Sequence, residues 1–247
     1  MRTRPSSDLV PGQRVAGVDG CRSGWVVAVA RVADEGPVVE SLGVTPTLAP
    51  VLERVARGEL SVVALDMPVG LAADGPRSAD RAARAALGPR RSSVFPAPVR
   101  AVLDATDHPD AVARSRAACG AGIPVQAWHL VPKVREVDDL LRAATARVRR
   151  AVRETHPELA FSLLGDGPCR HPKRTVAGRR ERLARLRPWV PDRWTTPSRT
   201  PAGAARDDVL DALVLAVRAA QWEGRGPTPL VLGGGTDEHG LPMQVWG

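Results

Sequence analysis

The 247-residue chain contains no tyrosine, only two phenylalanines and only three cysteines. Cys21, Cys119 and Cys169 are odd in number and widely spaced, which argues against a disulfide framework and against a C-x-x-C zinc site. No segment approaches eighteen consecutive apolar residues, and residues 1–13 lack the apolar centre of a signal peptide. We therefore expect a soluble protein of the reducing cytoplasm with no membrane partner.

The signature motifs of several large enzyme classes are missing as well. The chain has no GxxxxGK[ST], no GxGxxG after a strand and no GxSxG. These absences argue against a P-loop, a Rossmann dinucleotide site and a serine hydrolase. Because Phe95, Phe161 and six tryptophans are the only aromatic side chains, a platform that stacks several nucleobases is not expected either.

Positive charge is abundant, with a formal net charge of +8 and a pI near 10.9. Such a balance usually indicates nucleic acid or another polyanion as partner. Only two of the 35 cations are lysines, Lys133 and Lys173, so a genome-wide base composition also accounts for the arginine bias. Arginine still forms bidentate bonds to phosphate whatever placed it there. A polyanion-facing surface and an ordinary solvated surface both stay open.

Hydrophobic periodicity predicts an α/β fold in a single domain over residues 14–247, after a disordered tail over residues 1–13. A helical insertion is expected over about 68–147 and a Gly/Pro-rich tail over about 224–247, with a terminal hairpin of residues 230–232 and 243–246. The expected strands are 14–19, 25–32, 37–42, 61–65 and about 149–154. The expected helices are about 48–57, 77–87, 134–147, 157–164, 179–186 and 204–222.

Acidic residues stand where these elements bury apolar side chains. Asp19, Asp66 and Glu154 end strands, and Asp208 and Asp211 lie in the last long helix. A carboxylate in such a place needs a cation or several donors, and carboxylates that meet raise one another's pKa unless a divalent ion joins them. We therefore predict a Mg²⁺ or Mn²⁺ site made by these five residues.

Each acid also has a purely structural interpretation. Asp208 stands near a helix start, where acidic caps are routine, whereas Asp211 follows the cap region between Leu210 and Ala212. At 100° per residue, Asp208 and Asp211 lie about 60° apart and Asp207 and Asp211 about 40° apart, so either pair can face one cavity. Asp19 and Asp66 can be turn residues after strands. His156 is either a proton shuttle or a histidine bonded to backbone beside proline.

Basic residues supply candidate contacts to nucleic-acid phosphates. Arg77, Arg81 and Arg84 fall at i, i+4 and i+7, which predicts one basic helix face. Between residues 170 and 187 there are many cations and a single acid, Glu181. Such segments can hold phosphates without reading bases. Further candidates are Lys133, Lys173 and Arg174.

Several motifs resemble known families. Gly17-Val-Asp-Gly20 and Asp66-Met-Pro-Val-Gly70 resemble the acidic strand motifs of the RNase H-like superfamily, and Asp208-Val-Leu-Asp211-Ala-Leu resembles the late helix of Holliday-junction resolvases. Over nearly the whole chain, the sequence resembles the family known as domain of unknown function 429, described as predicted RNase H-like nucleases. The matching segments are 17–25, 66–70, 77–84 with 87–88, 93–98, 132–138, 154–158 and 207–212.

This resemblance implies an RNase H-like mixed sheet, three antiparallel strands followed by α, β, a helical insertion, β and α, with helices on both faces. It implies a divalent-metal-dependent nuclease that cleaves DNA or RNA. Asp19 would bridge two ions roughly 3.5 to 4 Å apart, with Asp66, Glu154, Asp208 and Asp211 as further ligands. Two alternatives stay open: a non-catalytic nucleic-acid or protein-binding module on this scaffold, and a nucleotide-binding phosphotransferase of the actin or sugar-kinase type.

Overall fold

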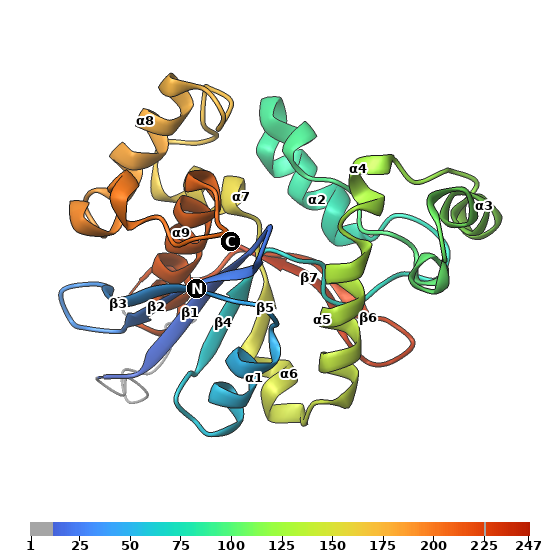
Figure 1. Ribbon diagram of the computed structural model, residues 1–247, viewed down its shortest axis with the longest axis horizontal. Helices are drawn as coiled ribbons and strands as arrows, with labels where there is room; N and C mark the ends of the chain where they lie inside the picture. The colour runs from blue at the N-terminus through green and yellow to red at the C-terminus, as the bar shows by residue number, and fades with distance from the viewer. Residues whose placement is uncertain (1–11, 225) are drawn as a thin grey trace.

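A mixed five-stranded sheet forms the centre of the protein, whose computed structural model describes residues 12–224 and 226–247 (Figure 1). The strand order is β3-β2-β1-β4-β5. Strands β1, β2 and β3 pair antiparallel, whereas β1, β4 and β5 run parallel to one another. The strands are β1 (Arg14–Cys21), β2 (Gly24–Arg31), β3 (Val38–Thr45), β4 (Val62–Leu65) and β5 (Val152–Glu154). The predicted α/β fold with a mixed sheet is confirmed. A disordered tail was predicted over residues 1–13, and residues 1–11 of it lie outside the described residues.

Helices cover both faces of this sheet (Figure 1). Because side chains alternate between the two faces of a strand, Ala16 and Val18 of β1 join one apolar core and Val15 joins the other. The first core is completed by α1 (Ala49–Ala56), α5 (Val131–Ala143) and α6 (Ala146–Ala151), and the second by α7 (Pro157–Leu164), α8 (Val176–Leu186) and α9 (Arg206–Glu223). In the described part of the chain, no helix is both long and apolar enough to cross a membrane.

The segment between β4 and β5 is helical, as expected. It holds α2 (Ser78–Leu87), α3 (His108–Cys119), α4 (Val125–Trp128) and α5, with 3-10 turns at Gly88–Ser93 and Arg100–Asp104. The other strands and helices expected before residue 230 also occur, with ends that differ by no more than three residues, apart from those around residue 147.

The boundaries around residue 147 were predicted wrongly. The expected helix over 134–147 ends at Ala143, and the expected strand over 149–154 begins only at Val152, because α6 lies between them. The Oγ1 of Thr145 accepts a hydrogen bond from the N–H of Val148, which caps α6. Arg149 donates to the carbonyl oxygens of Leu141 and Ala144 at the end of α5, where that of Leu141 also accepts from the N–H of Ala144.

The C-terminal segment packs against the domain as the hairpin that the sequence predicts. Strands β6 (Val231–Thr236) and β7 (Pro242–Trp246) pair antiparallel and contact α2. Trp246 forms a parallel bridge with Thr155, so β7 continues the edge of the sheet beyond β5. The buried carboxylate of Asp237 accepts hydrogen bonds from the backbone of Leu71 and Leu241, and Arg100 pairs with it.

The closest approach of helix to sheet occurs at Gly17, in the middle of β1. A Cβ atom at this position would lie 2.2 Å from the carbonyl oxygen of Ala212 and 2.2 Å from the amide nitrogen of Ala216, both in α9. Only a residue without a side chain lets the backbone of α9 rest on β1 at this depth. The packing therefore fixes where residues of α9 stand along β1.

The substitution Gly17→Ala tests this contact. We expect it to lower the free energy of unfolding by roughly 3 kcal/mol, the upper part of the usual range for overpacking, because the obstacles are backbone atoms of a buried helix. Gly43→Ala in β3 is the matched control, since nothing lies within 4 Å of its added Cβ. Urea unfolding of both variants measures the difference, and equal stability of the two would contradict the packing described.

Candidate active site

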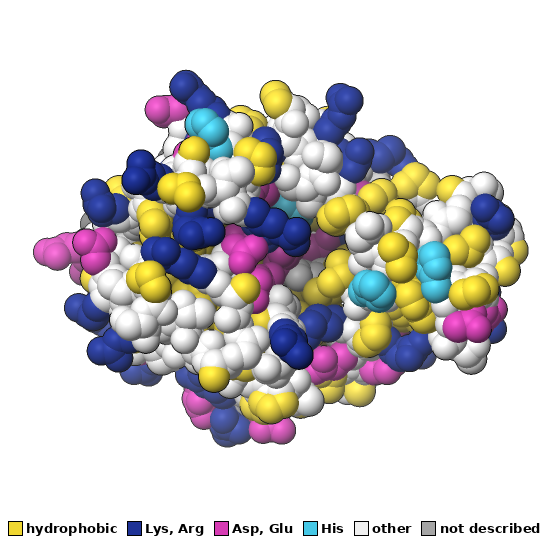
Figure 2. All heavy atoms as spheres, turned by 45° about the horizontal axis from the view of Figure 1, so that its top comes forward, with side chains coloured by type: hydrophobic (Ala, Val, Ile, Leu, Met, Phe, Trp, Pro, Cys, Tyr) yellow, Lys and Arg dark blue, Asp and Glu magenta, His cyan; other side chains and the backbone are white. Residues whose placement is uncertain are grey.

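A cavity of about 450 Å³ opens at the end of the sheet where β1, β4 and β5 finish. In Figure 2 acidic side chains lie inside the central hollow of the molecule, and Lys or Arg side chains stand on its rim. The lining includes Asp19, Asp66 and Asp211 together with Lys173 and Arg174. Segments far apart in the sequence therefore bring opposite charges to one place.

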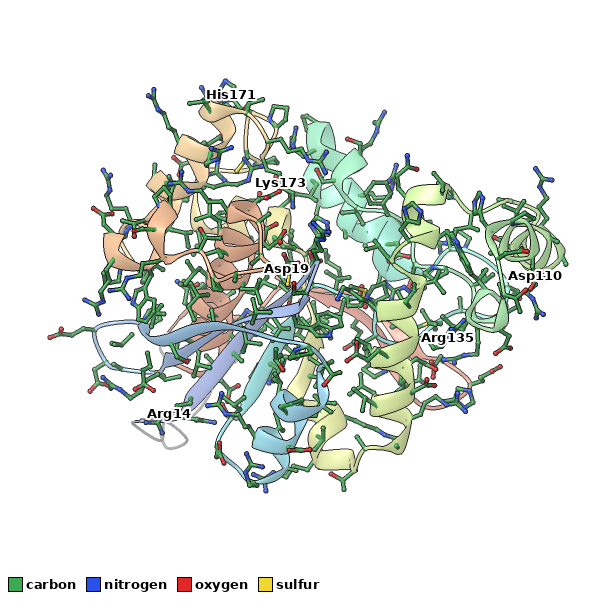
Figure 3. The ribbon with its side chains drawn as sticks, in the orientation of Figure 1. Arg14, Asp19, Asp110, Arg135, His171 and Lys173 are labelled. Carbon is green, nitrogen blue, oxygen red and sulfur yellow. The ribbon has the colours of Figure 1, made fainter. Side chains whose placement is uncertain are left out.

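Strand register explains why Asp19 and Asp66 are neighbours. Val18 of β1 lies beside Leu65 of β4 in parallel pairing, and the N–H of Asp66 donates to the carbonyl oxygen of Val18 at 2.9 Å. Asp19 and Asp66 are the next residues after this pair, so both lie at the same end of the sheet. Asp19 lies two residues after Gly17, so it faces the side of the sheet that α9 covers. Figure 3 shows Asp19 at the tip of β1 with Lys173 nearby on the side of α8.

Asp19 is a buried acid without a local donor. Its exposed fraction is 7%, and within residues 12–224 and 226–247 no group donates a hydrogen bond to its carboxylate. Burial raises the pKa of Asp19 well above its ordinary value, and the neighbouring charges of Asp66 and Asp211 raise it further. The carboxylate form of Asp19 is therefore short of positive charge.

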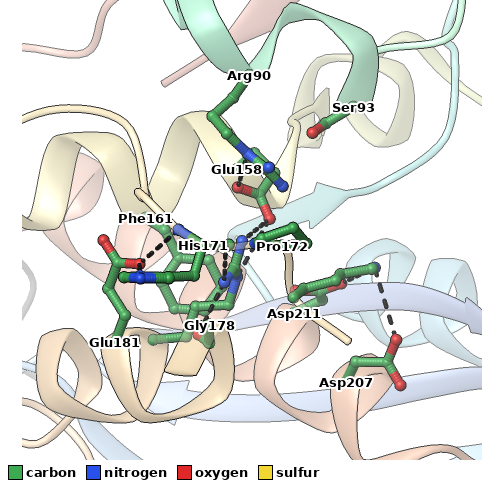
Figure 4. Close-up of polar contacts among 12 residues, drawn as sticks. Arg90, Ser93, Glu158, Phe161, His171, Pro172, Gly178, Glu181, Asp207 and Asp211 are labelled. Atoms are coloured by element: carbon green, nitrogen blue, oxygen red, sulfur yellow. Dashed lines mark hydrogen bonds and ion pairs between the residues drawn. The ribbon is translucent and has the colours of Figure 1, made fainter. Parts of the chain in front are cut away.

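Asp211 has one oxygen paired and one free. Its side chain is 1% exposed, and its Oδ2 accepts a hydrogen bond from the Nζ of Lys173 at 2.7 Å (Figure 4). Its Oδ1 is buried and has no partner among the described residues. Burial raises the pKa of Asp211 to about 6, although Lys173 acts to lower it. Burial in turn acts to lower the pKa of Lys173, but Asp211, Asp19 and Asp66 together outweigh this effect and raise it.

The cluster of Asp19, Asp66 and Asp211 fits a hard divalent cation by its chemistry. All its donors are carboxylate oxygens, which Mg²⁺ and Mn²⁺ prefer, and the free Oδ1 of Asp211 is aimed at no other group. Lys173 brings one positive charge against three carboxylates. No three His, Cys, Asp or Glu side chains of the described ranges stand as a preformed ligand set. The fit therefore rests on donor type and unmet charge.

Two predicted ligands have other hydrogen-bond partners, although the charge of Asp208 still acts on Asp19 and helps to raise its pKa. Asp208 is half-buried, and its Oδ2 accepts a hydrogen bond from the N–H of Ala205 at 2.8 Å, the capping role weighed above. Glu154 pairs with Leu65 across β4 and β5, so it faces the side of the sheet opposite Asp66. Its oxygens accept hydrogen bonds from Arg77 at 2.6 and 2.8 Å, although Glu154 still lines the cavity.

His156 lines the cavity with both ring nitrogens engaged. Its Nδ1 accepts a hydrogen bond from the N–H of Glu158 at 3.2 Å, and its Nε2 lies 3.0 Å from the carbonyl oxygen of Ser93. The tautomer with the proton on Nε2 satisfies both contacts. His156 thus begins α7 and ties it to the 3-10 turn before Val94, while the proton-shuttle role stays a prediction.

The basic face expected from Arg77, Arg81 and Arg84 does not form. Arg77 is 3% exposed, because the buried carboxylates of Glu154 and Asp80 surround its guanidinium group. Arg81 is exposed and bonds to the carbonyl oxygen of Pro76, whereas Arg84 bonds to that of Val94. This arrangement corrects the prediction of a single exposed face.

The remaining predicted cations separate into two groups. Lys133 donates a hydrogen bond to the carbonyl oxygen of Gly24 at 2.6 Å and lies over the ring of Trp25, so it braces the turn between β1 and β2. Lys173 and the exposed Arg174 stand at the cavity. Only this second group is placed beside the clustered carboxylates.

Three charged residues that line the cavity, Asp80, Glu158 and Arg90, were not among the predicted site residues. Glu158 is buried, with Oε1 bound by Arg182 and Oε2 without a hydrogen bond in the described part of the chain. The Nε of Arg90 lies 3.9 Å from that oxygen (Figure 4). In the sequence Glu158 looks like an ordinary acid in the first turn of a helix, so nothing signals its burial.

Comparison with known proteins assigns a family and no activity. Residues 17–232 match the family described as protein of unknown function (DUF429). No curated protein and no solved structure matches the chain.

Because the pKa of Asp211 is raised, we predict that Asp211 lowers the free energy of unfolding as the pH rises. Because the folded state holds this proton more tightly than the unfolded chain, ionisation of Asp211 destabilises the fold above about pH 6 and costs little below about pH 4. The separation between 3.8 and about 6 corresponds to about 3 kcal/mol. Without added divalent metal, we expect Asp211→Asn to be more stable than wild type by about this amount at pH 7.5.

Urea unfolding at pH 4 and pH 7.5 measures this effect. At pH 4 the advantage of Asp211→Asn should nearly vanish. Asp139→Asn, an exposed position on α5, controls for the loss of one carboxylate. An advantage of Asp211→Asn that does not grow with pH would show that Asp211 is not a strained buried acid.

Proposed function

Because the chain belongs to the DUF429 family of proteins of unknown function, we propose its activity from its own cavity: a divalent-metal-dependent nuclease that hydrolyses phosphodiester bonds in DNA or RNA. We further propose an RNase H-like fold. The strand order β3-β2-β1-β4-β5, with three antiparallel strands followed by two parallel ones, supports this assignment. Helices on both faces of the sheet support it as well.

The observation that carries the proposal is the meeting of three carboxylates that lack enough counter-charge. Asp19, Asp66 and Asp211 come from two adjacent strands and a helix, and they line one cavity. These three residues would hold the metal through carboxylate oxygens. Bound divalent ions of this kind polarise a phosphodiester and lower the pKa of water, so that hydroxide is available at neutral pH. The cluster would thus supply the ligands for the metal ion, and the metal would supply the positive charge that phosphodiester hydrolysis needs.

Lys173 and Arg174 give the cavity an attraction for phosphate. Both line the same space as the acids, and Lys173 keeps its proton because Asp211 lies 2.7 Å away. A cationic rim draws in a polyanion and positions its backbone without selecting a sequence. An arginine or lysine beside the reacting phosphate also offsets the charge that develops during hydrolysis.

A non-catalytic binding module is the second candidate, and one observation favours it. The ammonium group of Lys173 already occupies one oxygen of Asp211, so an amine partly satisfies the acid cluster. In that case the protein would bind nucleic acid without metal, with an affinity that falls steeply as salt rises. Binding without turnover separates this function from the nuclease.

The substitution Asp19→Asn tests the nuclease directly. Loss of a metal-bridging carboxylate should lower Mn²⁺-dependent cleavage of labelled DNA and RNA by more than about 100-fold, since even partners of metal ligands contribute 10- to 100-fold. The fold should persist, because the carboxyl of Asp19 makes no hydrogen bond with the described residues. Asp139→Asn on the surface of α5 should cleave like wild type, and full activity in Asp19→Asn would exclude this mechanism.

A further inference from the structure

One wall of the cavity is apolar and partly open to solvent. Phe95, Pro96, Pro98 and Leu130 form this apolar wall, and Phe95 and Leu130 are 52% and 42% exposed. Across residues 12–224 and 226–247, Phe95 is the only phenylalanine or tryptophan among the strongly exposed side chains. An aromatic ring left in water forgoes the roughly 1.5 to 3 kcal/mol that burial supplies. Because the ring lies beside a charged cavity, its exposure indicates a role in binding a ligand and not in packing the core.

The backbone on either side of Phe95 is anchored. The side chain of Val94 is buried, and the carbonyl oxygen of Val94 accepts a hydrogen bond from Arg84 at 2.6 Å. The N–H of Ala97 donates to the buried carboxylate of Asp80 at 3.0 Å, and prolines flank Ala97 on both sides. These contacts hold the segment in place and leave the ring of Phe95 exposed at the cavity. Such a ring is pre-organised for binding, because little conformational freedom remains to be lost.

The same cavity offers cations for a phosphate. Lys173, Arg174 and Arg90 line it together with the apolar wall and the carboxylates. A ligand that combines a flat apolar ring with phosphate groups matches this combination of surfaces. A volume of about 450 Å³ lies within the range of about 300 to 1,000 Å³ found for small-molecule pockets. The cavity is therefore of a size for a nucleotide unit and not for a duplex.

We propose that Phe95 stacks on the base of an unpaired nucleotide in a DNA or RNA strand whose phosphate lies toward Lys173 and Arg174. This inference rests on the proposed function and adds its substrate class, a strand that is single or has a base turned out of the helix. Stacking on one aromatic ring accepts any base, since every base has a π-face. The preference is therefore for unpaired bases and not for a sequence.

A double-mutant cycle between protein and ligand tests the proposal. Dissociation constants are measured for a single-stranded thymidine oligonucleotide and for an abasic strand of equal length, with Asp19→Asn present throughout to prevent cleavage. Base stacking on an aromatic side chain contributes about 1 to 3 kcal/mol. Phe95→Ala should therefore weaken binding of the thymidine strand by about 5- to 150-fold and leave the abasic strand nearly unchanged.

Two further variants make the result specific. Phe95→Trp keeps an aromatic face and should retain the affinity for the thymidine strand. Val38→Ala removes an exposed apolar side chain from β3, outside the cavity, and should change neither dissociation constant. Equal losses for the thymidine and the abasic strand in Phe95→Ala would overturn the stacking role.

Other outcomes separate this inference from the proposed function. Wild-type cleavage of DNA or RNA together with an unchanged affinity in Phe95→Ala would retain the nuclease and reject the base site. Base-dependent binding without any cleavage would retain the base site and reject the nuclease. Preference for a fully paired duplex over the single strand, or thymidine monophosphate binding as tight as the strand, would contradict an unpaired nucleotide of a strand as the ligand.

Discussion

The packing of α9 on β1 is the constraint on which the site depends. Gly17 has no side chain, so the backbone of α9 lies against β1 at Ala212 and Ala216. The same contact sets Asp211, the residue before Ala212, near Asp19, which lies two residues after Gly17 on the same face of the sheet. A structural requirement in the core thus brings Asp211 close to Asp19.

The acidic side chains inside this protein differ in whether an arginine pairs with them. Glu154 and Asp80 share Arg77, Glu158 is bound by Arg182, and Asp237 is paired with Arg100. The buried Asp19 and Asp211 and the half-buried Asp66 have Lys173 alone within hydrogen-bond distance among the described residues, and it reaches only Asp211. A chain rich in arginine therefore neutralises its other buried acids and leaves this cluster short of positive charge. That contrast, more than burial itself, makes the cluster a candidate binding site, whereas the other ion pairs stabilise the fold.

Strand and helix patterns in the sequence were enough to predict most strands and α7, because short valine-rich runs and helical spacing follow local rules. The mixed pairing of the sheet was predicted from the family resemblance. The patterns failed where tertiary contacts decide. Glu154 ends a strand as predicted, yet its register with Leu65 turns it to the opposite face, where Arg77 binds it. The helical spacing of Arg77 with Arg81 is real, but two buried carboxylates draw Arg77 inward. The periodicity of a sequence does not predict a buried ion pair of this kind, and it does not predict the burial of Glu158.

We predict that Asp19, Asp66 and Asp211 share a divalent ion, and a crystal structure of the protein soaked in Mn²⁺ measures this most directly. Anomalous density within coordination distance of carboxylate oxygens of all three residues, with the free Oδ1 of Asp211 among the ligands, is the expected result. Absence of manganese from this cavity at saturating concentration, with Lys173 still bound to Asp211, would contradict the central claim.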